Sequence, residues 1–111
     1  MNKPKVNVRI VLTTTASTKE AERIGRAVVT KKLAACVNVV PSIVSVFQWQ
    51  GKVQKSREAL LIIKSTKSRY AVLERTIRCM HSYEVPEILA LDVKRGYRQY
   101  LEWISRETAR N

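Results

Sequence analysis

The stretch AACVNVVPSIVSVFQWQGKVQKSREALLIIKST, residues 34–66, is rich in β-branched residues and carries a Gly-Lys pair near its middle. It predicts a β-hairpin that turns at Gly51, with Pro41 at a bulge, a kink or an edge because proline cannot donate to a sheet. Each arm has about 15 residues, where a typical strand has about 5 or 6. At about 3.3 Å per residue an arm spans roughly 50 Å, whereas a compact domain of this size has a radius of gyration of about 13 Å. The hairpin must therefore bend or project from its own domain.

A projecting hairpin exposes unpaired backbone groups and apolar side chains such as Phe47 and Trp49. Surfaces of this kind are normally covered by a partner. We therefore expect the chain to form an oligomer.

Residues on either side of the hairpin predict five further elements. Alternating apolar residues predict a strand over residues 5–14, and the Ser17 and Glu20 pair predicts a capping box that opens a helix. A second helix should end near His81, and a strand and a final helix should follow, separated by Gly96. The apolar residues that define these elements are Val6, Val8, Ile10 and Leu12, then Ala21, Ile24, Ala27 and Val28, then Tyr70, Leu73, Ile77 and Met80, then Ile88 and Ala90, and last Tyr97, Tyr100, Leu101 and Ile104.

The resulting order is strand, helix, strand, strand, helix, strand, with an additional C-terminal helix. This order is typical of the α+β ferredoxin-like sandwich, in which helices cover one face of an antiparallel sheet. We expect one such domain over residues 1–111.

Composition narrows the class of protein and of partner. The chain has 21 Lys and Arg against 9 Asp and Glu, a formal net charge of +12, which favours anionic partners. No apolar run approaches the roughly 20 residues of a membrane helix, and the N-terminus has no small-residue cleavage site, so we expect neither membrane insertion nor a signal peptide. Cys36 and Cys79 lack CxxC spacing, which indicates a reducing compartment, by default the cytoplasm.

The stretch MHSYEVPEILAL, residues 80–91, places the only histidine beside carboxylates where a strand should begin. His81, Glu84 and Glu87 are plausible ligands for a transition metal, and Cys36 could join them only through folding or from another subunit. The alternative is helix capping and loop hydrogen bonding, because metal sites usually have three or four protein ligands.

Enzyme chemistry is not expected. With one histidine, no GxSxG elbow and no glycine-rich phosphate loop, the chain lacks the usual hydrolase and nucleotide motifs. Its aromatic and basic residues also do not form the pattern of an RNA-binding domain of this topology. We therefore expect no specific nucleic-acid partner and no required cofactor.

KKLAACVNVVPSIVSVFQWQGKV, EALLIIKS, HSYEVPEILAL and YLEWI, in this order, resemble the CutA family of divalent-cation tolerance proteins over roughly residues 6–105. The resemblance implies a homotrimer similar in shape to PII signalling proteins, with long hairpins paired across subunits. It also implies a role in tolerance to divalent metals, copper in particular, and no defined reaction.

The residues that match the family pattern are Cys36, Trp49, Gly51, Glu58, Lys64, His81, Tyr83, Glu84, Pro86, Glu87, Tyr100 and Trp103. From the residues present we expect weak metal binding centred on His81, with Glu84, Glu87 and Cys36 as the other candidate ligands. The resemblance implies a cleft or assembly role for Trp49, Glu58, Lys64, Tyr83 and Trp103. Thr13 and Ser82 depart from the pattern, since some members have a cysteine at the first position and the family usually has a proline at the second. Residues 54–57 are basic where the family is commonly acidic.

Two other functions fit the charge of the chain. One is a PII-like sensor of a small anionic metabolite, and the other is a trimer that binds nucleic acid without sequence preference. In all three cases we expect the YEVPE stretch to end a helix, begin a strand and help line a cleft between subunits.

Overall fold

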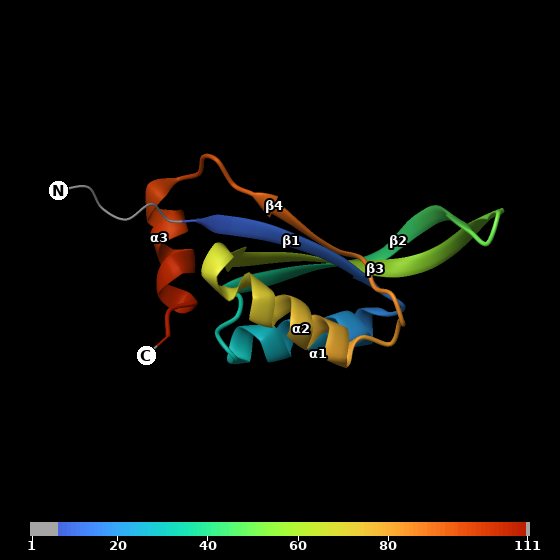
Figure 1. The fold of residues 1–111 in the computed structure, drawn as a ribbon, viewed down its shortest axis with the longest axis horizontal. Coiled ribbons are helices and arrows are strands. Elements are labelled where there is room, and N and C mark those ends of the chain that lie inside the picture. Colours follow the sequence, from blue (N-terminus) through green and yellow to red (C-terminus); the bar gives the residue numbers. More distant parts are fainter. Residues whose placement is uncertain (1–6, 111) are drawn as a thin grey trace.

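The computed structural model describes residues 7–110 and contains one four-stranded sheet with three α-helices and a short 3₁₀ segment, η1 (Figure 1). The elements are β1 (Val8–Thr15), α1 (Thr18–Thr30), β2 (Cys36–Trp49), β3 (Lys52–Thr66), η1 (Lys67–Arg69), α2 (Tyr70–Met80), β4 (Ile88–Asp92) and α3 (Arg98–Glu107). The strand order is β2-β3-β1-β4 and every pair is antiparallel. The ferredoxin-like α+β prediction is confirmed. Of the first predicted strand, residues 5 and 6 lie outside the described residues.

The core lies between the sheet and the helices α1 and α2, which cover the same face of the sheet (Figure 1). Leu61 and Ile63 of β3 are fully buried against Ile24 of α1 and Ile77 of α2. α3 lies across the end of the sheet and contacts β1 and β3. No helix in the described part of the chain is long and apolar enough to cross a membrane.

The hairpin is as long as predicted. β2 has 14 residues and β3 has 15, and the chain reverses at Gln50 and Gly51, whose φ angles are 52° and 79°. Two successive positive φ angles are typical of the type I′ turn, which matches the twist of the flanking strands. The molecule measures 56 × 25 × 21 Å with a radius of gyration of 15.1 Å, because the hairpin projects beyond the helices (Figure 1).

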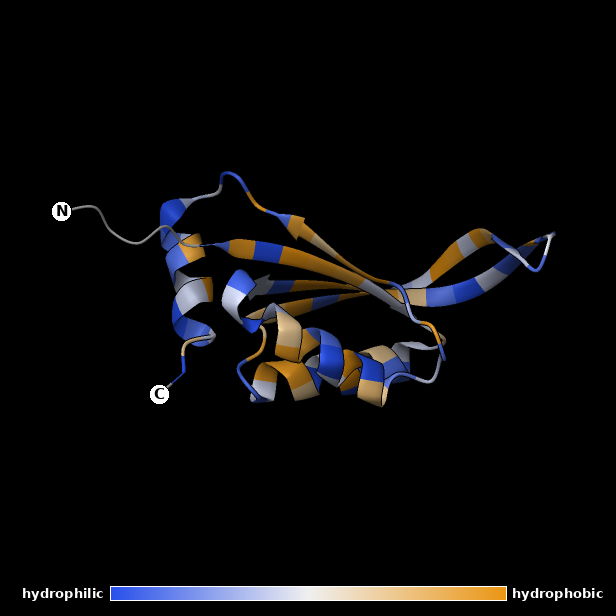
Figure 2. Cartoon of the chain, viewed as in Figure 1, coloured by the Kyte–Doolittle hydropathy of each residue, from blue (hydrophilic) through white to orange (hydrophobic). Residues whose placement is uncertain are grey.

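Pro41 lies at both a bulge and an edge. The register between β2 and β3 shifts between Val40 and Ile43, Ser42 takes a φ of 60°, and β2 is an outer strand of the sheet. Beyond the bulge, the two arms differ in character: Figure 2 shows the β2 arm mostly in the hydrophobic colour and the β3 arm mostly in the hydrophilic one. The exposed large apolar side chains of this region are Val44, Val46, Phe47, Trp49 and Val53.

The C-terminal helix differs from its prediction in which residues it buries. Tyr97 precedes α3 as its N-cap and is exposed, and Tyr100 is exposed and stacks on Trp103 instead of entering the core. Ile104 is buried and anchors the helix. The helical spacing of the aromatic residues therefore predicts that a helix is present, but it does not predict which face of the helix is buried.

Candidate functional site

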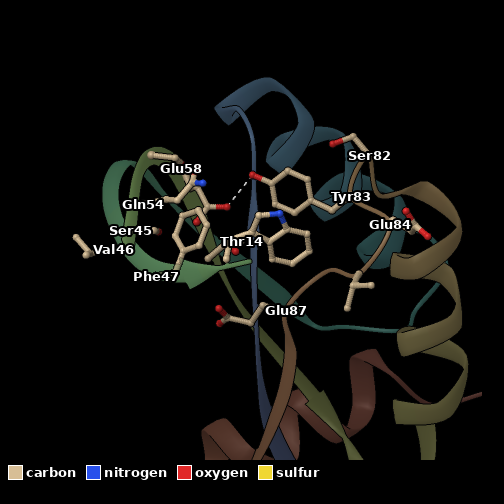
Figure 3. A pocket seen from close by; sticks show the side chains of 13 residues that line it. Thr14, Ser45, Val46, Phe47, Gln54, Glu58, Ser82, Tyr83, Glu84 and Glu87 are labelled. Carbon is tan, nitrogen blue, oxygen red and sulfur yellow. Dashed lines mark hydrogen bonds between the residues drawn. The ribbon is translucent and has the colours of Figure 1, made fainter. Parts of the chain in front are cut away.

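An open cleft of about 1030 Å³ lies between the distal hairpin, residues 43–58, and the loop after α2, residues 81–87 (Figure 3). Its lining residues are Thr14, Ser45, Val46, Phe47, Trp49, Gln54, Ser56, Glu58, Ser82, Tyr83, Glu84, Val85 and Glu87. Three of them are glutamates and none is Lys or Arg. In a chain with a net charge of +12, this cleft is an acidic, partly aromatic surface.

The 81–87 loop starts where the sequence predicts that α2 must end. His81 still donates its backbone N–H to Ile77 O, but its ψ of 141° is extended. Pro86 cannot continue a helix and restricts Val85 to extended backbone, so the chain runs out into the loop before β4 begins at Ile88. This local chemistry places Tyr83 and Glu84 among the residues that line the cleft.

His81 is held inside the protein by both ring nitrogens. Its side chain is fully buried, Nδ1 accepts from the Tyr83 backbone N–H at 3.0 Å, and Nε2 lies 2.7 Å from the Thr14 carbonyl oxygen. Since Nδ1 accepts, Nε2 carries the proton and donates to Thr14, which is the neutral tautomer. His81 Nδ1 is also 3.8 Å from Glu20 Oε2, close enough to pair with that carboxylate when the imidazole is protonated. The imidazole therefore ties the loop to β1.

Glu20 gives the loop a second anchor. Its Oε2 accepts from the Ser82 backbone N–H at 2.8 Å, and its Oε1 accepts from the Ser82 hydroxyl at 3.0 Å and from the Ala16 N–H at 3.3 Å. Burial alone raises the pKa of this carboxyl, but the hydrogen bonds from Ser82, with smaller contributions from the nearby His81 and from Ala16, hold the pKa below its ordinary value. The predicted capping by Ser17 is confirmed, since Ser17 Oγ accepts from the Glu20 N–H. The Glu20 carboxylate, however, accepts two hydrogen bonds from Ser82 of the loop and only one from Ala16 near the helix start.

Tyr83 joins the loop to the hairpin. Its hydroxyl donates to Glu58 Oε2 at 2.7 Å, and Figure 3 shows the ring reaching from the loop toward β3. Burial, this hydrogen bond and the negative charges of Glu58 and Glu20 raise the pKa of Tyr83 to about 12. Its ring also packs against the His81 ring, with centroids 4.9 Å apart. Tyr83 is thus a neutral donor that links the two sides of the cleft.

Of the nine predicted site residues, the structure brings five to this cleft, buries the His81 side chain behind the loop and leaves three elsewhere. Trp49, Glu58, Tyr83, Glu84 and Glu87 line it. Cys36 of β2 lies opposite Lys64 of β3, at the other end of the sheet, and Lys64 also lies opposite Ile10 of β1. Ile10 is four residues, or about 13 Å along β1, from Thr14, which lines the cleft. Trp103 lies on α3 against Tyr100.

Within residues 7–110, no group of three or more His, Cys, Asp or Glu side chains is arranged to hold a metal ion. His81 offers no free nitrogen, because both are engaged in hydrogen bonds. The available donors are the exposed carboxylates of Glu84 and Glu87. Carboxylate oxygens suit hard divalent cations, which also retain water ligands.

Sequence reasoning missed the two residues that hold the loop, Glu20 and Ser82. Glu20 was assigned only to a helix cap, and Ser82 was noted only as a departure from the family pattern. Their contact spans 62 positions, so no local spacing indicates it. Phe47 was predicted to need a covering surface, and the cleft supplies part of one.

The family model described as CutA1 divalent ion tolerance protein matches residues 9–107. A Thermus thermophilus protein named divalent-cation tolerance protein CutA is 41% identical over 99 residues, which cover 89% of this chain and 96% of the relative. The rice protein CutA 1, chloroplastic, is 46% identical over 100 residues, but the chain spans only 56% of its length. None of these names states a reaction.

Solved structures agree with the sequence relatives. The Thermus thermophilus divalent cation tolerance protein superposes with a TM-score of 0.90 at 40% identity, covering 92% of this chain and 99% of that one. CutA1 from Oryza sativa gives a TM-score of 0.91 at 40% identity, covering 96% of this chain and 97% of that one. Both fold and sequence are shared over nearly the whole described chain.

Proposed function

The chain belongs to the CutA1 divalent ion tolerance family, and from this premise we propose that it is a divalent-cation tolerance protein that binds the cation weakly at the acidic cleft of a trimer. The observation that carries the site is the charge of the cleft. Three glutamates and no Lys or Arg line it, although the chain has 21 Lys and Arg. Such segregation favours a cation at this cleft, because the side chains that line it carry only negative charge.

Glu84 and Glu87 are the proposed ligands, because both residues line the cleft and no hydrogen bond within residues 7–110 ties either carboxylate to the loop. Glu58 is not proposed as a ligand, because its carboxylate accepts the hydrogen bond from the Tyr83 hydroxyl. Figure 3 shows the two carboxylates on different sides of the loop, so each would hold a cation that keeps most of its water ligands, which makes the affinity low. A copper(II) site at His81 requires the imidazole to leave Thr14 or Tyr83, so copper binding there is coupled to loop movement.

Calorimetric titration of Mn²⁺ and of Cu²⁺ into chelator-treated protein tests this site. The variant Glu84→Gln/Glu87→Gln should lose at least about tenfold in affinity, or about 1.4 kcal/mol. Glu22→Gln/Glu107→Gln removes the same charge from exposed sites outside the cleft and should retain affinity. Equal losses in both variants, or no binding to the parent protein, exclude the cleft site. His81→Ala then reports whether copper uses the imidazole.

The trimer is proposed on the surfaces that a single chain leaves uncovered. The hairpin projects, Leu89 and Leu91 of β4 are 55% and 53% exposed, and β2 and β4 both have a free edge. Exposed apolar strands at sheet edges normally pair with another chain. Light scattering should give about three times 12.7 kDa across dilution.

The proposal includes no catalytic step, and a reducing compartment such as the cytoplasm suits the two free thiols, Cys36 and Cys79. A PII-like sensor of an anionic metabolite is not favoured at this cleft, because its carboxylates would repel such a ligand. The comparisons favour neither that role nor nucleic-acid binding as the function of the chain.

A further inference from the structure

The helical layer presents a cationic face to solvent. Its exposed basic residues, named here the basic helical face, are Lys19, Arg23 and Arg26 on α1, Lys67 on η1, and Arg75 and Arg78 on α2. Within each helix they recur three or four positions apart, which places them on one side. The opposite sides carry the buried residues that pack on the sheet, among them Ile24 and Ile77. Charges that look dispersed along the sequence therefore gather on one surface.

The two stripes of this face belong to one surface. α1 and α2 contact each other beneath the same face of the sheet (Figure 1). Arg23 Nη2 donates to the carbonyl oxygen of Met80, at 3.4 Å, and so links α1 to the end of α2. From Lys19 to Arg26 the α1 stripe runs about 10 Å along its axis.

Few negative charges offset this face. Glu22 is its exposed carboxylate, while Glu74 is half-buried and accepts from the Tyr70 hydroxyl, and Glu20 is turned toward Ser82. Within residues 7–110, none of the six cations forms an ion pair. The face thus has a large, uncompensated positive charge.

The types of side chain that this face lacks limit the class of partner that it can bind. Among the described residues of α1 and α2, the one large apolar side chain that is exposed is Val29, at 39%. A protein interface usually has a buried aromatic or apolar centre, a membrane-surface helix has apolar residues that insert, and single-stranded nucleic acid stacks on exposed rings. Rows of cations alone match the phosphates of a duplex.

We propose that the basic helical face binds the phosphate backbone of double-stranded nucleic acid without reading its sequence, as a second surface separate from the acidic cleft. None of the six residues lines the cleft. The affinity should come from release of counterions, and it should fall linearly on a logarithmic salt scale with a slope of about −0.9 for each phosphate neutralised.

The first test measures this slope with a mixed-sequence DNA duplex of about 20 base pairs, two turns of B-DNA. Lys19→Gln/Arg75→Gln/Arg78→Gln should weaken binding and make the slope shallower by roughly 2 to 3 units. Lys94→Gln/Arg95→Gln/Arg106→Gln removes the same number of charges from outside the helical layer and should leave the slope nearly unchanged. Equal effects of the two triple variants, or no binding even at low salt, overturn the proposal.

The second test locates the bound duplex without altering a cation. Cys79 is exposed on α2 next to Arg78, whereas Cys36 is half-buried at the start of β2. In a Cys36→Ser variant, saturating duplex should suppress labelling of Cys79 by a neutral maleimide. In a Cys79→Ser variant, labelling of Cys36 should continue. Unchanged Cys79 reactivity in the complex overturns the proposal, whatever the triple variants do.

A third arm distinguishes the duplex from other phosphate surfaces. Vesicles of phosphatidylcholine with phosphatidylserine should bind more weakly than the duplex at equal phosphate concentration, because the face has no apolar side chains to insert. If vesicles protect Cys79 and the duplex does not, the face is a membrane-docking surface and the nucleic-acid proposal is wrong.

Discussion

The hydroxyl of Tyr83 donates to Glu58 Oε2 at 2.7 Å, and this bond joins the loop after α2 to the arm of β3. The same loop is tied to β1 through His81 and to α1 through Ser82. Three elements that are distant in sequence therefore fix one wall of the acidic cleft. The Tyr83 bond is the contact that connects this wall to the hairpin.

Tyr83→Phe should lower the free energy of unfolding by about 1 to 3 kcal/mol, because it leaves the Glu58 carboxylate without its donor. Urea denaturation followed by circular dichroism measures this loss. Tyr100→Phe is the matched control: Tyr100 is exposed and its ring stacks on Trp103, so the change should stay within about 0.5 kcal/mol. Equal stability of Tyr83→Phe and the parent would mean that the bond contributes nothing.

The same tyrosine makes stability depend on alkaline pH. Its pKa is raised from 10.0 to about 12, so the folded state favours the protonated phenol. This contribution is fully present below pH 10 and is lost as the pH rises toward 12. The stability difference between the parent protein and Tyr83→Phe should therefore shrink over that interval. A difference that stays constant from pH 9 to about 12 contradicts the raised pKa.

Glu20→Gln tests the anchor on α1. The carboxylate accepts three hydrogen bonds, and an amide cannot accept all of them, so the substitution should cost about 1 to 3 kcal/mol near neutral pH. Because the pKa of Glu20 is lowered from 4.5, its contribution is present above pH 4.5 and is lost as the pH falls through the lower folded value. Stability curves of the two proteins should converge in acid.

Glu22→Gln, an exposed change on the same helix, is the control for that experiment and should alter stability by no more than about 0.5 kcal/mol. Parallel acid curves for Glu20→Gln and the parent protein would show that the Ser82 contacts do not depend on the charge of Glu20.

Most of the fold was predictable because its signals are local. Gly51 and the apolar arms around it indicate the hairpin, Pro41 indicates the bulge and the edge, and Ser17 indicates the start of α1. Each of these depends on backbone chemistry within a few residues. What the local patterns missed is burial on α3, where Tyr100 is exposed and stacks on Trp103 while Ile104 is buried.

The bonds around the candidate site could not be predicted from the sequence. The spacing around His81 predicts a loop that carries carboxylates and lines a cleft between subunits, and in the single chain Glu84 and Glu87 of that loop line a cleft against its own hairpin. It did not indicate that both imidazole nitrogens are engaged, since one partner, Thr14, lies 67 positions away. A histidine has the same identity in the sequence whether it is a ligand or a structural bridge, and only the fold decides which atoms remain available.

A substitution at Thr13 should increase stability, whereas the substitutions at Tyr83 and Glu20 should decrease it. Its side chain is fully buried in β1, and Oγ1 has no hydrogen-bond partner within residues 7–110. Thr13→Val keeps the β-branched shape and removes the unsatisfied hydroxyl, so it should raise stability by about 1 kcal/mol. Ser65→Ala is the contrasting control, because Ser65 donates to Leu33 O at 2.6 Å and its removal should destabilise the protein. A less stable Thr13→Val protein would indicate an ordered water at Oγ1.

Trp49 is the residue on which the proposed assembly is easiest to test. It lies next to the hairpin turn and is 56% exposed in a single chain, although its side chain is a large aromatic ring system. If a neighbouring subunit covers it, Trp49→Asp buries an unpaired charge in each of three equivalent places, at several kcal/mol each. Light scattering should then show the mass falling toward 12.7 kDa on dilution.

The control for Trp49→Asp is Ala71→Asp, which adds the same charge at an exposed position on α2, away from the hairpin. It should leave the mass unchanged, so any general effect of adding a carboxylate to this basic chain is subtracted. If the parent protein is a folded monomer at all concentrations, the trimer proposal is wrong. If the parent is trimeric and Trp49→Asp is equally so, the subunits meet elsewhere, and the open sheet face around Leu89 and Leu91 becomes the next place to substitute.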